Sequence, residues 1–256
     1  MRYHDLKAAH RHAPSRMLAI RAAAVRAVLT RAQAVVGVSR KEAKRVNATF
    51  RKRPHAELNL EQTFDNTLVK PHPDADDLVV HHREQKELSC AMMLDTSLSM
   101  SGQKLALLAV AATVLAFRLP SADFALIAFE SAASTLKKMR IKMSVPQVAK
   151  VILEVPAIGY TNIEAALAEG IQQLALGRHK NRVGILLTDG KYTAGADPIL
   201  QAARYRTLHV VLLGDFNTDP DACQAIAKTG HGRLFKAQAF HELPRTLYRL
   251  LNDLLR

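Results

Sequence analysis

From Leu88 to the end of the chain, short runs of apolar residues alternate with segments of helical periodicity. Three of these runs, Leu88–Leu94, Arg182–Thr188 and Leu208–Leu213, lack the polar alternation of a half-exposed strand. Continuous apolar runs are typical of strands buried on both faces, and their alternation with helices indicates a parallel sheet between two helical layers. The pattern therefore predicts a doubly wound α/β fold, in which ligands bind beyond the carboxyl ends of the strands.

Helical segments separate the strands and complete the alternation. Residues 102–119 are apolar around nearly their whole circumference, as expected of a buried helix, and Pro120 ends them. Asn162–Leu176 has apolar residues at helical spacing. We expect the other strands at residues 123–130, 134–139 and 234–237, and other helices from Ser144, after Asp197-Pro198, after Asp219-Pro220 and at 242–255. The sequence thus predicts a mainly parallel sheet with helices on both faces.

The N-terminal part of the chain is different in charge and in pattern. Residues 1–55 contain 14 Lys or Arg and only two acids, a net charge of +12, whereas the remainder has 22 basic and 21 acidic residues. Pro14–Val38 is Ala-rich and predicts a helix, with arginines every five residues that spiral around it. We expect 46–72 to be irregular apart from a short helix at 58–68, and 74–82 to be a strand or an extended segment. The predicted organisation is a basic, largely helical extension (1–57), a lead-in segment (58–87) and a main domain (88–256).

Several classes of protein do not fit this sequence. The longest apolar run lies within residues 105–117 and is too short to span a membrane. The first residues carry charges and histidines where a signal peptide has its apolar stretch, although an Arg- and Ala-rich start also suits an organellar transit peptide. Cys90 and Cys223 are far apart and form no CxxC pair, which indicates reduced core cysteines. We expect a cytoplasmic protein.

Oxygen-bearing side chains follow two of the predicted strands and precede two of the predicted helices. Asp95, Ser97 and Ser99 alternate directly after the first strand, Thr161 precedes a helix, and Asp189 ends a central strand. These are hard oxygen ligands with no His or Cys beside them, which favours Mg²⁺, Mn²⁺ or Ca²⁺ over zinc or copper. The five residues are therefore the candidate ligands of one divalent cation, most simply Mg²⁺.

Each of these residues also has a structural interpretation. Ser97, Ser99 and Thr161 are residue types that cap helix N-termini, and Asp189 before Gly190 suits a turn. Lys104, in the first turn of the helix at 102–119, is expected to be solvated. The metal hypothesis depends on the joint occurrence of the residues and on their position at strand ends.

The motifs DTSLSMSG (95–102), GYTN (159–162) and LLTDG (186–190) resemble the metal-ion-dependent adhesion site of von Willebrand factor A domains. The resemblance covers about two thirds of the chain, from Leu88 onward, and implies a Rossmann-like fold with a mainly parallel six-stranded sheet that carries the ion. It further implies that Ser97, Ser99 and Thr161 ligate the cation through their hydroxyls. Asp95 and Asp189 would act mainly through bound waters. One coordination position would stay open for an acidic side chain of a partner.

The motifs of several enzyme classes are absent from the sequence. There is no G-x-x-x-x-G-K-[ST] loop for a nucleoside triphosphate and no G-x-S-x-G nucleophile elbow. Phosphatases that use a strand-terminal Asp need a second acid two residues later, where this chain has Ser97. The sequence therefore predicts a binding module and not an enzyme.

Two partners are compatible with the sequence. The segment 58–95 resembles the lead-in of intracellular proteins that work with AAA+ ATPases of the MoxR or magnesium-chelatase kind, which implies capture of an acidic residue during remodelling or assembly of a target complex. Alternatively, the basic residues 1–55 bind the phosphates of a nucleic acid, with the main domain as a protein-contact platform. Aromatic residues are sparse in that segment, with only Tyr3 and Phe50, which disfavours recognition by base stacking.

Overall fold

The computed structural model of the chain describes residues 14–38, 45–52, 57–68, 70, 72, 74–83 and 87–255. The backbone forms two compact units. The larger unit contains helix α2 (Pro14–Val38) and the residues from 87 onward, and the smaller unit contains residues 40–86. Residues 1–13, 39–44 and 53–55 of the predicted basic segment lie outside the described residues. Within the described residues, no helix is both long enough and apolar enough to cross a membrane.

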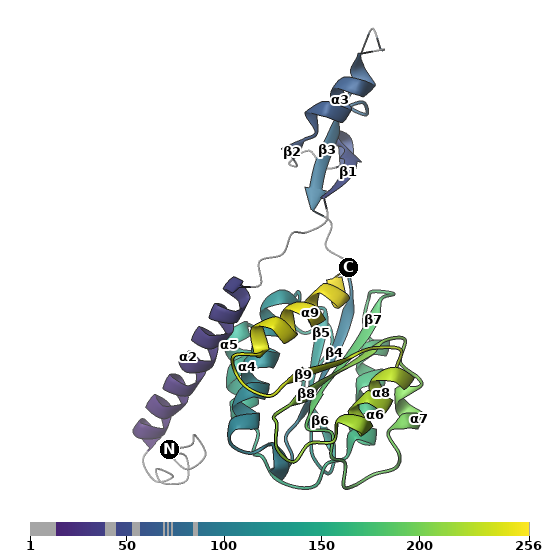
Figure 1. The fold of residues 1–256 in the computed structure, drawn as a ribbon. Helices are drawn as coiled ribbons and strands as arrows, with labels where there is room; N and C mark the ends of the chain where they lie inside the picture. The colour runs from purple at the N-terminus through teal and green to yellow at the C-terminus, as the bar shows by residue number, and fades with distance from the viewer. Residues whose placement is uncertain are drawn as a thin grey trace. The chain divides into compact units, whose positions relative to one another are not determined.

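A six-stranded sheet forms the centre of the larger unit (Figure 1). The strand order is β6-β5-β4-β7-β8-β9, and only the edge strand β6 runs antiparallel to its neighbour. The predicted mainly parallel, Rossmann-like sheet is therefore confirmed. The strands are β4 (Ser89–Asp95), β5 (Phe124–Phe129), β6 (Ala133–Lys137), β7 (Arg182–Thr188), β8 (Leu208–Leu213) and β9 (Leu234–Ala237).

Helices cover both faces of this sheet, which explains the continuous apolar runs. Every residue of β4, β5 and β8 is buried. Figure 1 shows α4, α5 and α9 on one face and α6, α7 and α8 on the other. The helices are α4 (Gln103–Arg118), α5 (Val145–Glu154), α6 (Ile163–Ala175), α7 (Ile199–Ala202), α8 (Pro220–Thr229) and α9 (Leu243–Leu255).

Helix α2 packs against α4 and α5, so the N-terminal helix belongs to the larger unit. Its side chains Val28, Ala32 and Val35 are buried, and the guanidinium of Arg118 at the end of α4 donates to the carbonyl of Val36 at 2.9 Å. With the sheet on one side and α2 and α5 on others, α4 is enclosed. This enclosure explains why α4 is apolar around its whole circumference.

Among its described residues, the smaller unit contains a three-stranded antiparallel sheet of order β1-β3-β2, an α-helix and a short 3₁₀ helix (η1, Phe50–Lys52). The expectation of irregular structure is wrong for residues 46–52 and 57–58, which form strands and a 3₁₀ turn, whereas the short helix and the later strand are confirmed. Thr63 joins α3 to β3, because its hydroxyl donates to the carbonyl of Val79 at 3.2 Å and accepts the Val79 N–H at 3.0 Å. The elements are β1 (Arg45–Thr49), β2 (Glu57–Leu58), α3 (Leu60–Thr67) and β3 (Val79–Arg83).

Candidate functional site

The candidate site lies where the strand order changes direction. The chain passes from β4 to β5 on one side of β4 and later returns to β7 on the other side. Helical connections therefore leave in opposite directions from the carboxyl ends of β4 and β7, which is the usual position of a ligand crevice in such sheets. Asp95 is the last residue of β4, and Asp189 follows the last residue of β7.

Asp95 is fully buried and is held by two hydrogen bonds. Its Oδ1 accepts the backbone N–H of Ser97 at 3.0 Å, and its Oδ2 accepts the hydroxyl of Thr188 at 2.5 Å. Burial raises the pKa of Asp95 to about 6, the hydrogen bonds from Ser97 and Thr188 oppose this shift, and the nearby charge of Asp189 adds to it. Asp95 is thus a buried carboxylate beside a second one, and a cation would stabilise its charged form.

The hydroxyls of Ser97 and Ser99 lie side by side and are hydrogen-bonded to each other. Their Oγ atoms lie 3.1 Å apart. Ser97 precedes the short 3₁₀ helix η2 (Leu98–Met100), but its side chain makes no capping hydrogen bond, and the N-cap residue of α4 is Gly102. The helix-capping interpretation of Ser97 and Ser99 therefore finds no support in these contacts.

Thr161 is buried in the loop before α6, where the N-cap residue is its neighbour Asn162. The Thr161 carbonyl accepts the N–H groups of Thr193 and Ala194 at 2.9 and 3.2 Å, and the Thr161 N–H donates to the Thr193 hydroxyl at 3.1 Å. These backbone contacts join the loop of Thr161 to the loop that follows Asp189. Because Asn162 caps α6, the Thr161 hydroxyl has no capping role at this helix.

Asp189 is also fully buried, and Lys104 is its charged partner. The ammonium of Lys104 lies 2.8 Å from Asp189 Oδ2, while Asp189 Oδ1 accepts the N–H of Lys191 at 3.2 Å. Only 14% of the Lys104 side chain is exposed. The expectation that Lys104 is solvated is therefore wrong, since the turn after β7 brings a buried carboxylate within its reach.

That turn requires a glycine. Gly190 has φ of +87°, and a Cβ on it would lie 2.3 Å from the carbonyl oxygen of Asp219. The Gly190 N–H donates to the Thr188 hydroxyl at 3.0 Å. Thr188 therefore links the turn to Asp95 and is a supporting residue that the sequence analysis did not identify, although the motif LLTDG contains it.

The donor chemistry of this edge fits a hard divalent cation. The described residues contain no cluster of three or more His, Cys, Asp and Glu that could hold a metal, so any ion would depend on hydroxyl oxygens as well as carboxylates. Two adjacent ligands of an octahedral Mg²⁺, with bonds of about 2.0–2.1 Å, are about 3 Å apart. The separation of 3.1 Å between the hydroxyl oxygens of Ser97 and Ser99 is compatible with that geometry.

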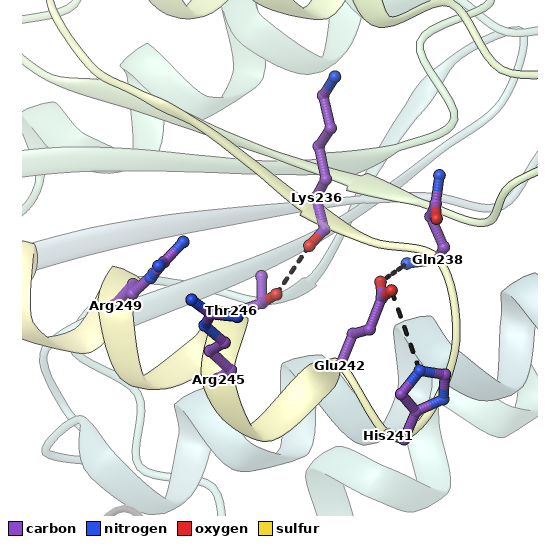
Figure 2. Close-up of a pocket in the computed structure, with 7 residues that line it drawn as sticks. All are labelled: Lys236, Gln238, His241, Glu242, Arg245, Thr246 and Arg249. Carbon is purple, nitrogen blue, oxygen red and sulfur yellow. Dashed lines mark hydrogen bonds and ion pairs between the residues drawn. The ribbon is translucent and has the colours of Figure 1, made fainter.

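A second feature of the surface lies between β9 and α9. A depression of about 610 Å³ is lined by the basic side chains of Lys236, His241, Arg245 and Arg249, together with Glu242 (Figure 2). The Glu242 carboxylate accepts the N–H of Gln238 at 2.7 Å. Within the described residues, no carboxylate lies within 4 Å of the charged groups of Lys236, Arg245 or Arg249. The depression is thus basic, and none of the candidate cation ligands lines it.

Known proteins share this fold and part of the sequence. An uncharacterized protein of Synechocystis sp. is 32% identical over 184 residues, which are 67% of this chain and 43% of the relative. The chain therefore spans less than half the length of that curated relative. Among solved structures, von Willebrand factor type A from Catenulispora acidiphila has a TM-score of 0.58 at 18% identity, covering 69% of this chain and 44% of that protein.

Two further structures are similar over the same region. The conserved hypothetical protein BatB from Bacteroides thetaiotaomicron has a TM-score of 0.55 at 17% identity, covering 66% of this chain and 98% of that one. Proximal thread matrix protein 1 from the mussel byssus, with a zinc-occupied MIDAS motif, has a TM-score of 0.55 at 20% identity, covering 67% and 49%. At these identities the likeness concerns the fold. The sequence model of the von Willebrand factor type A domain matches residues 91–249, more than half of the chain, and the chain therefore belongs to that family.

Proposed function

We propose that the chain is a non-catalytic protein-binding module that holds one divalent cation, most simply Mg²⁺, and uses it to capture an acidic side chain of a partner. The observation that carries the proposal is the meeting of buried carboxylates and side-chain hydroxyls that cap no helix at one edge of the sheet. Asp95 and Asp189 supply the charge, and Ser97, Ser99 and Thr161 supply neutral oxygens. An ion held mainly by neutral ligands stays electrophilic toward a further carboxylate.

The surroundings of the site suit a protein partner. Leu98, Ile158, Tyr160 and Tyr192 are large apolar side chains on the three loops that carry the candidate ligands, and all four are exposed. Aromatic and apolar side chains are enriched in the buried core of protein interfaces. We therefore expect the captured carboxylate to be flanked by apolar residues of the partner.

The identity of the partner follows only from sequence resemblance. The segment 58–95 resembles the lead-in of proteins that act with MoxR-type AAA+ ATPases, so we propose such an ATPase, or its client, as the source of the acidic residue. The absence of a nucleotide-binding loop from the sequence supports a module that does not hydrolyse ATP itself. A cytoplasmic location remains a prediction from the sequence.

Titration with Mn²⁺, followed by electron paramagnetic resonance of the free ion, tests the proposal. We expect wild type to bind about one ion per chain and Asp189→Ala to lose this binding, because the variant removes a carboxylate of the site. The matched control is Asp215→Ala, which removes an exposed carboxylate from the loop after β8. Equal binding by wild type and Asp189→Ala, with circular dichroism showing both folded, would exclude a cation site at this edge.

Nucleic-acid binding is the second candidate function, and the net charge of +12 in residues 1–55 favours it. In α2, however, Arg21 lies 3.7 Å from Glu154, and the guanidinium of Arg31 lies over the ring of Phe240 at 4.5 Å. These two arginines already contact residues of the main domain, which is why we rank this function second. Failure of the whole chain to bind random duplex DNA at low salt would remove it.

A further inference from the structure

Lys104 is built into the candidate site by three separate contacts. Besides its ion pair with Asp189, its ammonium donates to the carbonyl of Asn217 at 3.3 Å. A Cβ on Gly214 would lie 2.8 Å from Cε and 3.0 Å from Cγ of Lys104. Gly214, with φ of +91°, therefore leaves room for the stem of the lysine at the end of β8.

The backbone around Asn217 also fits this role. Asn217 has φ of +54°, in the left-handed region that Asn adopts more readily than most residues. Its carbonyl faces Lys104, and its side-chain oxygen accepts the ammonium of Lys191. The loop after β8 thus helps to hold the Lys104 ammonium against Asp189.

The charges of the site then determine what it binds. Asp95 and Asp189 together carry a charge of −2 when ionised, and Lys104 reduces this to −1. A divalent cation converts the site to +1, and one carboxylate from outside restores neutrality. Without Lys104 the cation alone would neutralise the site, and a further carboxylate would leave it negative. Interactions among partly buried charges of this kind are screened little by salt.

We propose that Lys104 is an internal cation that weakens divalent-ion binding by the chain alone and makes strong binding depend on a carboxylate supplied by the partner. This inference rests on the proposed function of the site. Lys104 acts through Asp189, which its ammonium contacts, and is therefore a positioning residue. Its effect is a coupling between two ligands, so that the ion and the acidic group each strengthen the binding of the other.

The test compares Mn²⁺ affinity in wild type, Lys104→Met and Lys104→Gln, with acetate as the probe carboxylate and chloride at equal ionic strength as its control. Lys104→Met keeps the length of the apolar stem, and Lys104→Gln keeps a hydrogen-bond donor without the charge. We expect both variants to bind Mn²⁺ about tenfold more tightly than wild type in chloride. Lys150→Met, which removes an exposed lysine from α5, should leave the affinity unchanged.

Acetate separates coupling from a merely structural effect. It should strengthen Mn²⁺ binding by wild type several-fold and have little effect on Lys104→Met. If Lys104 only stabilised the loop, its replacement would weaken Mn²⁺ binding. A gain in Mn²⁺ affinity therefore distinguishes the electrostatic role from a structural one. Unchanged or weaker binding by both variants, while wild type binds and Asp189→Ala does not, would overturn this inference and leave the proposed function standing. Binding of Mn²⁺ by Lys104→Met but not by wild type would support the inference. No binding of Mn²⁺ by wild type or by either Lys104 variant would refute both this inference and the proposed function.

Discussion

Thr188 provides a sharp test of how the candidate site is held together. Its side chain is fully buried, its hydroxyl donates to Asp95 Oδ2 at 2.5 Å, and the same oxygen accepts the N–H of Gly190 at 3.0 Å. Thr188→Val keeps the shape of the side chain and removes both hydrogen bonds. The variant leaves a buried carboxylate with one donor fewer and a buried N–H without its acceptor.

The expected cost follows from these two losses. A hydrogen bond to a charged group contributes about 1.5–3 kcal/mol, and leaving a buried polar group unsatisfied costs about 1–3 kcal/mol. The more apolar valine offsets part of this cost, so we expect Thr188→Val to lower the free energy of unfolding by about 3 kcal/mol. For a domain of this size the loss corresponds to a decrease in Tm of about 10 °C.

Thr113→Val is the matched control. Thr113 is equally buried, in α4, but its hydroxyl donates to the carbonyl of Ala109 at 2.7 Å, four residues earlier in the same helix. That bond is an additional contact to a neutral acceptor, and its loss should change stability by less than about 1 kcal/mol. Urea unfolding monitored by circular dichroism in the presence of a chelator measures both variants without bound ions. A loss in Thr188→Val no larger than in Thr113→Val would refute the reasoning.

Two further predictions concern parts of the domain away from the site. Burial lowers the pKa of Lys137 from 10.5 to about 8, so the unfolded chain binds more protons between these values, and stability should rise with pH across that window. Between pH 8 and pH 10 the free energy of unfolding, measured with urea, should rise by about 2 kcal/mol more in wild type than in Lys137→Met. The same rise in both proteins would contradict this prediction. Ala32→Glu places a charge at a fully buried position of α2 and should lower the free energy of unfolding of the larger unit by about 3 kcal/mol. Ala34→Glu, on the exposed side of the same helix, should leave it unchanged. Equal effects of the two variants would mean that α2 does not pack as described.

The sheet was predictable because its signals are local and strong. Continuous apolar runs mark strands that are covered on both faces, and β4, β7 and β8 lie within one residue of the runs that predicted them. Helix α2 was predicted with its observed bounds from its composition. Its position against α4 and α5 was not, because Val28, Ala32 and Val35, which pack on one face at helical spacing, do not stand out from the alanines on the exposed faces of the same helix.

At the site, the sequence predicted the candidate ligands but not their supports. Asp95, Ser97 and Asp189 follow strand ends within short motifs, so their grouping could be argued from the position of each strand alone. Lys104 is 85 residues from Asp189 in the chain, and nothing local distinguishes it from a solvated lysine on a helix. Contacts of this kind depend on how the connections between strands fold back, and sequence patterns carry no information about them.

Stability and binding make opposite demands on this edge of the sheet. Two carboxylates, Asp95 and Asp189, are fully buried within electrostatic reach of one another, and burial together with the charge of Asp189 raises the pKa of Asp95 to about 6 against the opposing hydrogen bonds. A domain selected only for stability would place apolar side chains at such positions, since replacing buried ionic groups by well-packed apolar ones is often neutral or stabilising. The fold instead retains both charges, compensates one of them with Lys104, and holds the other with Ser97 and Thr188. Such an arrangement holds unfavourable electrostatic energy that a bound cation would relieve, and this connects the cost of the buried acids to the proposed function.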